Sequence, residues 1–110
     1  MKADLVTLGE SLLMTAILLQ NNDAYGAAIF DRACELAKPA NVSYGSLYPT
    51  LERLEKRGFL KSKLGDPIPE RGGKSRRYFA VTAAGQTALR RSEAFATKIS
   101  AGLAKAWGTA

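Results

Sequence analysis

The sequence predicts a mainly α-helical fold with one small β-hairpin, and three observations support that prediction. Apolar residues recur at helical spacing along four stretches of the chain. Two short strand-like runs flank a loop rich in proline and glycine. The apolar fraction of 46% and the charged fraction of 24% are typical of a soluble globular protein, so we expect the 110 residues to form one compact domain.

A first helix is expected from Thr7 to about Gln20. Thr7 and Glu10 have the spacing of a capping box, in which the two side chains satisfy free backbone donors at the start of a helix. The apolar residues that follow, including Leu12 and Ile17, cover much of the circumference. We therefore expect this helix to be largely buried, in part against a second subunit.

A second helix is expected from Tyr25 to about Ala37, with Asp23 as its cap and a proline-containing break at residues 39–41. A third helix follows after only a few residues. It should end at Gly58, because glycine readily adopts the left-handed conformation that closes a helix.

The start of the third helix is left open by the sequence. If Ser46 is the N-cap, Pro49 falls in the first turn, where its missing N–H costs nothing. If Ser43 is the N-cap, Pro49 must distort the opening turn. Both starts are compatible with the apolar pattern that follows.

The second half of the chain is expected to form a hairpin and then a long helix. Residues 59–64 and 76–82 are the strand-like runs, and the turn-rich loop at residues 65–73 joins them. Thr82 should cap a last helix that extends from Ala83 to about Trp107.

The last helix carries an apolar stripe with steps of mostly four residues. Little of a chain this short remains for such a helix to pack on, so we expect the stripe to meet a second copy of the chain. With one residue of the first helix, the predicted dimer interface comprises Leu12, Leu89, Phe95, Ile99, Leu103 and Trp107.

The order of these elements is three helices, a hairpin and a helix. A short break between the second and third helices, followed by a hairpin, is the arrangement of a helix-turn-helix with a wing. We therefore predict a winged-helix DNA-binding unit over residues 1–82 and a C-terminal dimerisation helix over residues 83–110.

The positive charge of the chain is concentrated in one segment. Between Arg53 and Arg77 lie nine basic residues and three acidic ones, whereas the rest of the chain is balanced, so this segment supplies the whole net charge of +6. Such a concentration is expected of a surface that binds a polyanion, although a solvated basic face is the simpler alternative.

The third helix has an apolar side and a polar, basic side on a helical wheel. Leu47, Leu51 and Leu54 lie on the first side, and small hydroxyl groups and arginines lie on the second. Because arginine can pair bidentately with guanine, Arg53 is our candidate for reading a base. Arg57, near the end of the helix, is expected at a phosphate or in solvent.

The remaining DNA contacts are expected from the hairpin loop and from the turn before the third helix. Arginines of a wing can lie on the phosphate backbone or enter a narrow minor groove. The predicted DNA-binding residues are Ser43, Tyr44, Ser46, Tyr48, Pro49, Thr50, Arg53, Arg57, Arg71, Lys74 and Arg76.

Three segments of the sequence resemble the PadR-type transcriptional regulators, namely residues 23–29, 45–60 and 73–85. The middle segment is the most specific, because a Tyr48-Pro49 pair lies within an amphipathic helix that ends in Arg57-Gly58. The single short C-terminal helix is similar to that of the smaller subfamily. The resemblance implies a homodimer, often a repressor, whose N-terminal and C-terminal helices form the interface and whose paired recognition helices bind a near-palindromic operator.

The same resemblance implies a possible effector site. Where members of the family respond to small phenolic or drug-like molecules, the pocket lies at the dimer interface. Phe95, Ile99 and Trp107 are the candidates for its lining, although an aromatic stripe is more often ordinary dimer core. The resemblance implies double-stranded DNA and a second copy as partners, and it does not identify the ligand.

Several other classes of function are disfavoured by the composition. The chain has no histidine and a single cysteine, Cys34, so we expect no metal site, no cofactor and no particular role for this thiol. Its acidic residues show no pairing pattern that would suggest an enzyme. No stretch approaches the ~20 apolar residues that span a bilayer, and residues 1–4 lack the layout of a signal peptide, so we expect a cytoplasmic protein.

Two binding functions remain as alternatives to DNA reading. A winged helix can serve as a protein-interaction module, but the third helix should then present apolar residues where Ser46, Thr50 and Arg53 stand. Double-stranded RNA is disfavoured because its deep, narrow major groove does not admit a recognition helix.

Overall fold

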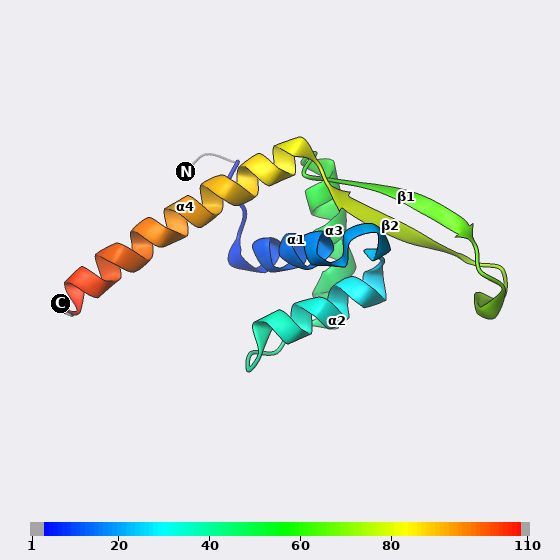
Figure 1. Cartoon of the computed structure of the whole chain (residues 1–110), viewed down its shortest axis with the longest axis horizontal. Helices are drawn as coiled ribbons and strands as arrows, with labels where there is room; N and C mark the ends of the chain where they lie inside the picture. The colour runs from blue at the N-terminus through cyan, green and yellow to red at the C-terminus, as the bar shows by residue number, and fades with distance from the viewer. Residues whose placement is uncertain (1–3, 109–110) are drawn as a thin grey trace.

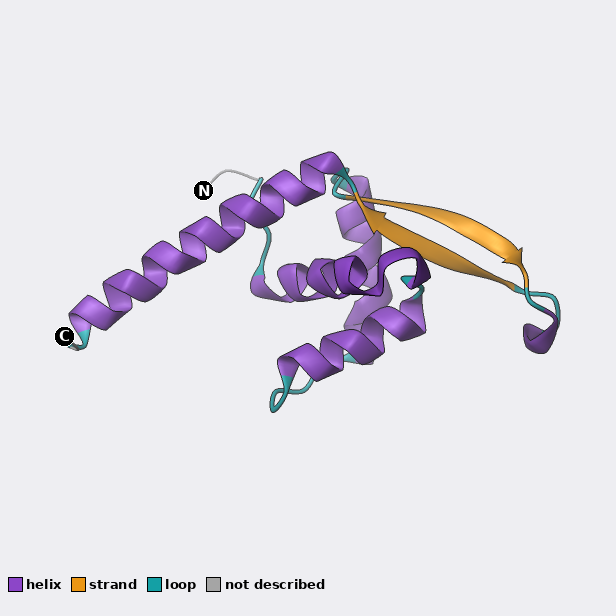
Figure 2. Ribbon diagram, viewed as in Figure 1, coloured by secondary structure: helices purple, strands orange, loops and turns teal. Residues whose placement is uncertain are grey.

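The computed structural model describes residues 4–108, so the ends of both predicted units, residues 1–3 and 109–110, lie outside the described residues. It confirms a mainly helical fold with a two-stranded antiparallel hairpin (Figure 2). The elements are α1 (Leu8–Gln20), α2 (Gly26–Ala37), α3 (Leu47–Lys56), β1 (Leu60–Pro67), β2 (Ser75–Val81) and α4 (Ala83–Ala106), with single 3₁₀ turns at Asn21–Asp23, Tyr44–Ser46 and Pro69–Arg71.

The three shorter helices form a central body from which two arms extend. The hairpin projects to one side of the body and α4 to the other (Figure 1). The principal extents are 59 × 29 × 22 Å, and the radius of gyration of 16.2 Å exceeds the ~13 Å expected of a compact chain of this length. Much of the chain therefore lies away from its own core.

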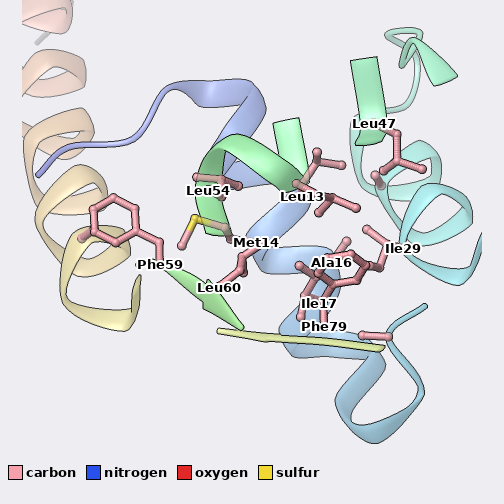
Figure 3. Close-up of a cluster of buried hydrophobic side chains, with 14 residues drawn as sticks. Leu13, Met14, Ala16, Ile17, Ile29, Leu47, Leu54, Phe59, Leu60 and Phe79 are labelled. Carbon is pink, nitrogen blue, oxygen red and sulfur yellow. The ribbon is translucent and has the colours of Figure 1, made fainter. Parts of the chain in front are cut away.

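The hydrophobic core lies where the three helices meet the base of the hairpin (Figure 3). Phe59, Leu60 and Phe79 close it from the hairpin. The helices supply its other large members, which are Leu13, Met14, Ile17, Ile29, Leu47, Leu51 and Leu54. Because each helix buries one stripe of side chains, the packing sets the position of α3 relative to the hairpin.

Helix α1 begins and ends where the sequence predicts. The backbone N–H of Thr7 donates to Glu10 Oε1 at 2.8 Å, and the N–H of Glu10 donates to Thr7 Oγ1 at 3.1 Å, so the capping box is present. The expectation that α1 is largely buried holds only in part, because Leu8, Leu18 and Leu19 are exposed.

The starts of α2 and α3 refine the sequence prediction. Asp23 does not cap α2, because it lies within a 3₁₀ turn and Tyr25 takes the cap position. Ser46 is the N-cap of α3, and Pro49 falls in its first turn, so the helix starts at the later of the two possible positions. A 3₁₀ turn precedes it and carries the chain from Tyr44 to Ser46.

The hairpin is longer than predicted. Leu60 pairs with Val81 at its base and Pro67 with Ser75 near its tip, with an irregularity in register between Leu64 and Pro67. The N–H of Phe79 donates to the carbonyl of Ala24 at 2.8 Å, which ties β2 to the turn before α2. The base of the hairpin is thus anchored, while its tip extends beyond the body.

Helix α4 is capped by Thr82, whose Oγ1 accepts the N–H of Gly85 at 3.1 Å. At this end, a Cβ on Gly85 would approach the carbonyl oxygen of Phe59 to 2.3 Å, so only glycine permits this contact with the hairpin base. From Glu93 to Gly108 every residue of the single chain is exposed. Among residues 4–108, no helix is both long enough and apolar enough to cross a bilayer.

Candidate nucleic-acid interface

The exposed side of α3 is the centre of the candidate interface. Leu47, Leu51 and Leu54 are buried on the other side, as the helical wheel predicts. The helical wheel was wrong for Thr50: the sequence placed this residue on the outer side, and the structure shows it buried. At about 100° per residue it lies beside the leucines, at the edge of the core.

Arg53 extends from α3 and remains accessible at its outer end. Its side chain is 56% exposed, its Nε lies 3.5 Å from Glu10 Oε2, and its Nη2 donates to Thr50 Oγ1 at 3.3 Å. A guanidinium held in this way can still present donors to an acceptor outside the protein.

Arg57, which was expected at a phosphate or in solvent, contacts other groups of its own chain. Its Nη1 donates to Glu10 Oε1 at 3.3 Å, and its Nη2 donates to the carbonyl oxygen of Leu5 at 2.9 Å. The guanidinium also lies 4.6 Å from the centre of the Phe59 ring, and the side chain is only 28% exposed. Its observed contacts join α3 to the segment before α1.

A hollow of about 270 Å³ lies between the start of α2, the turn before α3 and the hairpin. Its lining brings together four of the predicted DNA-binding residues, namely Tyr44, Tyr48, Arg71 and Arg76. The guanidinium of Arg76 lies 4.0 Å from the centre of the Tyr25 ring, an attractive cation–π geometry. The wing and the helix-turn-helix therefore share one basic, aromatic surface.

Tyr48 is positioned in this hollow by close packing. A Cβ on Gly26 would come within 2.0 Å of the Tyr48 hydroxyl, so a larger residue at the start of α2 would displace the Tyr48 side chain from this position. Burial raises the pKa of the Tyr48 hydroxyl above its ordinary value, and a hydrogen bond with Tyr44 is the second cause of this rise. The hydroxyl is therefore protonated at neutral pH and can donate to a phosphate oxygen.

A second, larger hollow of about 690 Å³ lies on the other flank of α3, against the first half of α1 and the segment after α2. Four more of the predicted residues line it, namely Ser43, Ser46, Thr50 and Arg53. Pro49 is exposed on α3 itself, and Lys74 is exposed on the hairpin tip, away from both hollows. The predicted DNA-binding residues are thus divided between the two flanks of α3 and the wing.

Sequence reasoning overlooked two acidic residues at this surface. Glu52 is exposed on α3, and at 100° per residue it points farther from the leucine side than Arg53 does. Glu10 was assigned only to the capping box, but it also contacts two arginines of the α3 region. The wheel could have identified Glu52, whereas no local pattern could have linked Glu10 to residues more than forty positions away.

The residues predicted for the dimer interface fall into two groups. Leu12 and Leu89 are partly buried and pack against the core of their own chain. The other four lie along the free half of α4 and are exposed, with Trp107 at 70%. Within residues 4–108, no cluster of acidic residues and cysteine could hold a metal ion, and Cys34 is half-buried.

Comparison with protein families gives a match over most of the chain. The model of the transcriptional regulator PadR-like family matches residues 15–91. No curated protein sequence matches significantly.

Several solved structures are similar to this chain. A PadR family transcriptional regulator from Eggerthella lenta DSM 2243 is 28% identical, with a TM-score of 0.73 over 93% of this chain and 85% of that one. A PadR-like transcription factor from Bacteroides fragilis is 25% identical, with a TM-score of 0.66 over 86% of this chain and 84% of that one. The Orc1 protein of Aeropyrum pernix, solved in complex with DNA, is 21% identical, with a TM-score of 0.62 over 84% of this chain and 26% of that one, and shows a likeness of fold alone.

Proposed function

This chain belongs to the PadR-like family of transcriptional regulators, and from that premise we propose that it represses transcription as a homodimer bound to a near-palindromic operator. In this proposal, α3 enters the major groove, the hairpin lies on the neighbouring backbone or minor groove, and α4 joins the two subunits. The protein acts by binding and carries out no catalysis.

The observation that carries the proposal is the position of the charge. The segment that supplies the whole net charge of +6 includes the exposed end of α3, all of β1 and the first three residues of β2. Lining residues from the α3 turn and from the hairpin meet in the smaller hollow, so the two elements form a continuous surface. A helix that presents Arg53 and Lys56 beside a basic wing is suited to a groove and its flanking phosphates.

The homodimer is supported by the free half of α4. A helix of 24 residues is about 36 Å long, and only its first turns contact the body. Phe95, Ile99, Leu103 and Trp107 form an apolar stripe on the remainder, which a second copy would cover. A two-fold axis there would place two copies of α3 on two half-sites, as a near-palindrome requires.

An effector site at this interface completes the proposal. The same stripe includes a phenylalanine and a tryptophan, which suit the aromatic face of a small molecule. Binding there would change the separation of the two α3 helices and release the operator.

The test is a titration, followed by fluorescence anisotropy, of the protein into duplex DNA from the region upstream of its own gene and into random duplex, each at two salt concentrations. The proposal predicts a preference for the native region of about 10³-fold or more, with affinity that falls as salt rises. Salt-dependent binding without preference would contradict an operator in that region. No binding at low salt would favour the protein-interaction alternative.

A further inference from the structure

We propose that Glu10 is a positioning residue for base recognition, since it holds Arg53 so that the outer edge of the guanidinium faces the DNA. The inference rests on the proposed function, because it concerns how α3 reads its operator. It assigns a part in base recognition to a carboxylate on α1, the helix that precedes the helix-turn-helix.

Glu10 is a buried carboxylate at the junction of three segments. Its side chain is only 5% exposed, yet both oxygens face outward from α1 toward α3. Oε1 accepts the N–H of Thr7 at 2.8 Å and Nη1 of Arg57 at 3.3 Å. Oε2 lies 3.5 Å from Nε of Arg53. The cap fixes the carboxylate, and the carboxylate in turn fixes the arginines.

Arg53 is held along one edge only. Its Nε faces Glu10, and its Nη2 donates to Thr50 Oγ1, so these two contacts occupy the inner edge of the planar group. Within residues 4–108, no acceptor is recorded for Nη1. The outer edge, formed by Nη1 and the second hydrogen of Nη2, can therefore donate two parallel hydrogen bonds to O6 and N7 of guanine.

A purely structural role for the Glu10–Arg53 contact explains the geometry less well. Arg57 already neutralises the Glu10 carboxylate through a less exposed contact. An ion pair with a partner that is 56% exposed contributes little to folding stability. The Glu10–Arg53 contact does restrict the Arg53 side chain in the free protein. Because this side chain is ordered before binding, the entropic cost of binding DNA is lower.

The experiment uses a duplex that the wild-type protein selects from a randomised DNA pool and a random duplex of equal length. The measured quantity is the specificity ratio, which is the dissociation constant for the random duplex divided by that for the selected duplex at one salt concentration. Glu10→Gln keeps an oxygen for the Thr7 N–H and removes the charge that orients Arg53. We expect the ratio to fall by roughly fivefold, the lower end of the value of one bidentate base contact, with no loss of affinity for random duplex.

Two further variants distinguish positioning from a general effect of charge or folding. Glu35→Gln makes the same charge change on an exposed part of α2 and should leave the ratio unchanged. Thr50→Val removes the second acceptor of Arg53 without touching Glu10, and it should lower the ratio even if Glu10→Gln folds poorly in urea titrations.

A double-mutant cycle completes the test. In an Arg53→Ala background, Glu10→Gln should no longer change the ratio, because the side chain that it positions is absent. An unchanged ratio in both Glu10→Gln and Thr50→Val would overturn the inference, as would a full-sized effect of Glu10→Gln in the Arg53→Ala background. If the wild-type protein selects no sequence from the pool, the proposed function itself fails and this inference fails with it.

Discussion

The central body of α1, α2 and α3 buries a core of large apolar side chains, whereas the distal half of α4 leaves its large apolar side chains exposed. Met14, Ile29 and Leu54 are completely buried in the body, while Ile99 and Trp107 are more than half exposed on α4. An amphipathic helix in a protein is stabilised mainly by packing of its apolar face. The contrast suggests that the body completes its core within one chain and that α4 completes its packing in an assembly.

The largest expected effect comes from placing charge on the exposed stripe. Ile99→Asp combined with Leu103→Asp would bury four carboxylates in the proposed homodimer, each without a partner and each costing several kcal/mol. We expect monomers by light scattering, with the helical content of the body retained in circular dichroism.

A matched control for this variant lies on the opposite side of the same helix. Thr97→Asp combined with Ala101→Asp adds the same charge at the same spacing, on residues that point away from the stripe. This control should remain dimeric. A dimer that survives the stripe variant would place the interface elsewhere and remove the contrast between body and α4.

Within the body, the expected effect is on stability. Leu54→Ala would leave a cavity among Leu51, Met14 and their neighbours in the core, and should reduce the free energy of unfolding by about 2–5 kcal/mol. Urea denaturation at fixed protein concentration would measure it. Phe95→Ala, made in the monomeric stripe variant, is the comparison, since the distal half of α4 there has no core to lose. An equal effect there would contradict the distinction.

A smaller effect is expected at the exposed side of α3. Arg53→Ala should weaken binding to the selected duplex by about 1–3 kcal/mol and relax sequence preference, since one bidentate base contact is worth about that much. Fluorescence anisotropy with selected and random duplexes would show it. Equal losses on both duplexes would mean that Arg53 contacts phosphate and reads no base.

The smallest effect is expected at the tip of the hairpin. Lys74 is exposed there, and Lys74→Ala should weaken binding to every duplex about equally while reducing the slope of log affinity against log salt by roughly one. Titrations at four salt concentrations would measure the slope. A changed base preference would instead assign the wing a part in reading sequence.

The outline of the fold could be predicted because its signals are local. The capping box of Thr7 and Glu10, the glycine after α3 and the proline-rich loop act over a few residues, and each appears in the structure close to its predicted place. The ends of the hairpin and the cap of α2 were less accurate, because strand pairing and turn geometry depend on contacts with other elements.

The candidate site shows where local patterns stop being sufficient. Helical periodicity predicts the angle of a side chain around α3 but not how deeply its neighbours cover it, so Thr50 was assigned to the wrong side. Arg57 was expected at a phosphate or in solvent from its charge and its place near the end of the helix, and the sequence did not predict its contacts with Leu5 and Glu10. The Arg57 contacts depend on Leu5 and Glu10, which are distant from it in sequence.

By itself, the sequence determined the class of fold, the segment that carries the charge and the apolar stripe of the last helix, because composition and periodicity act along the chain. The tertiary structure decided which arginine is held inward and which stays accessible. Glu10 lies more than forty residues from Arg53 and Arg57 in sequence and within 3.5 Å of both in space. Such a contact exists only once the hydrophobic core has brought α1 against α3.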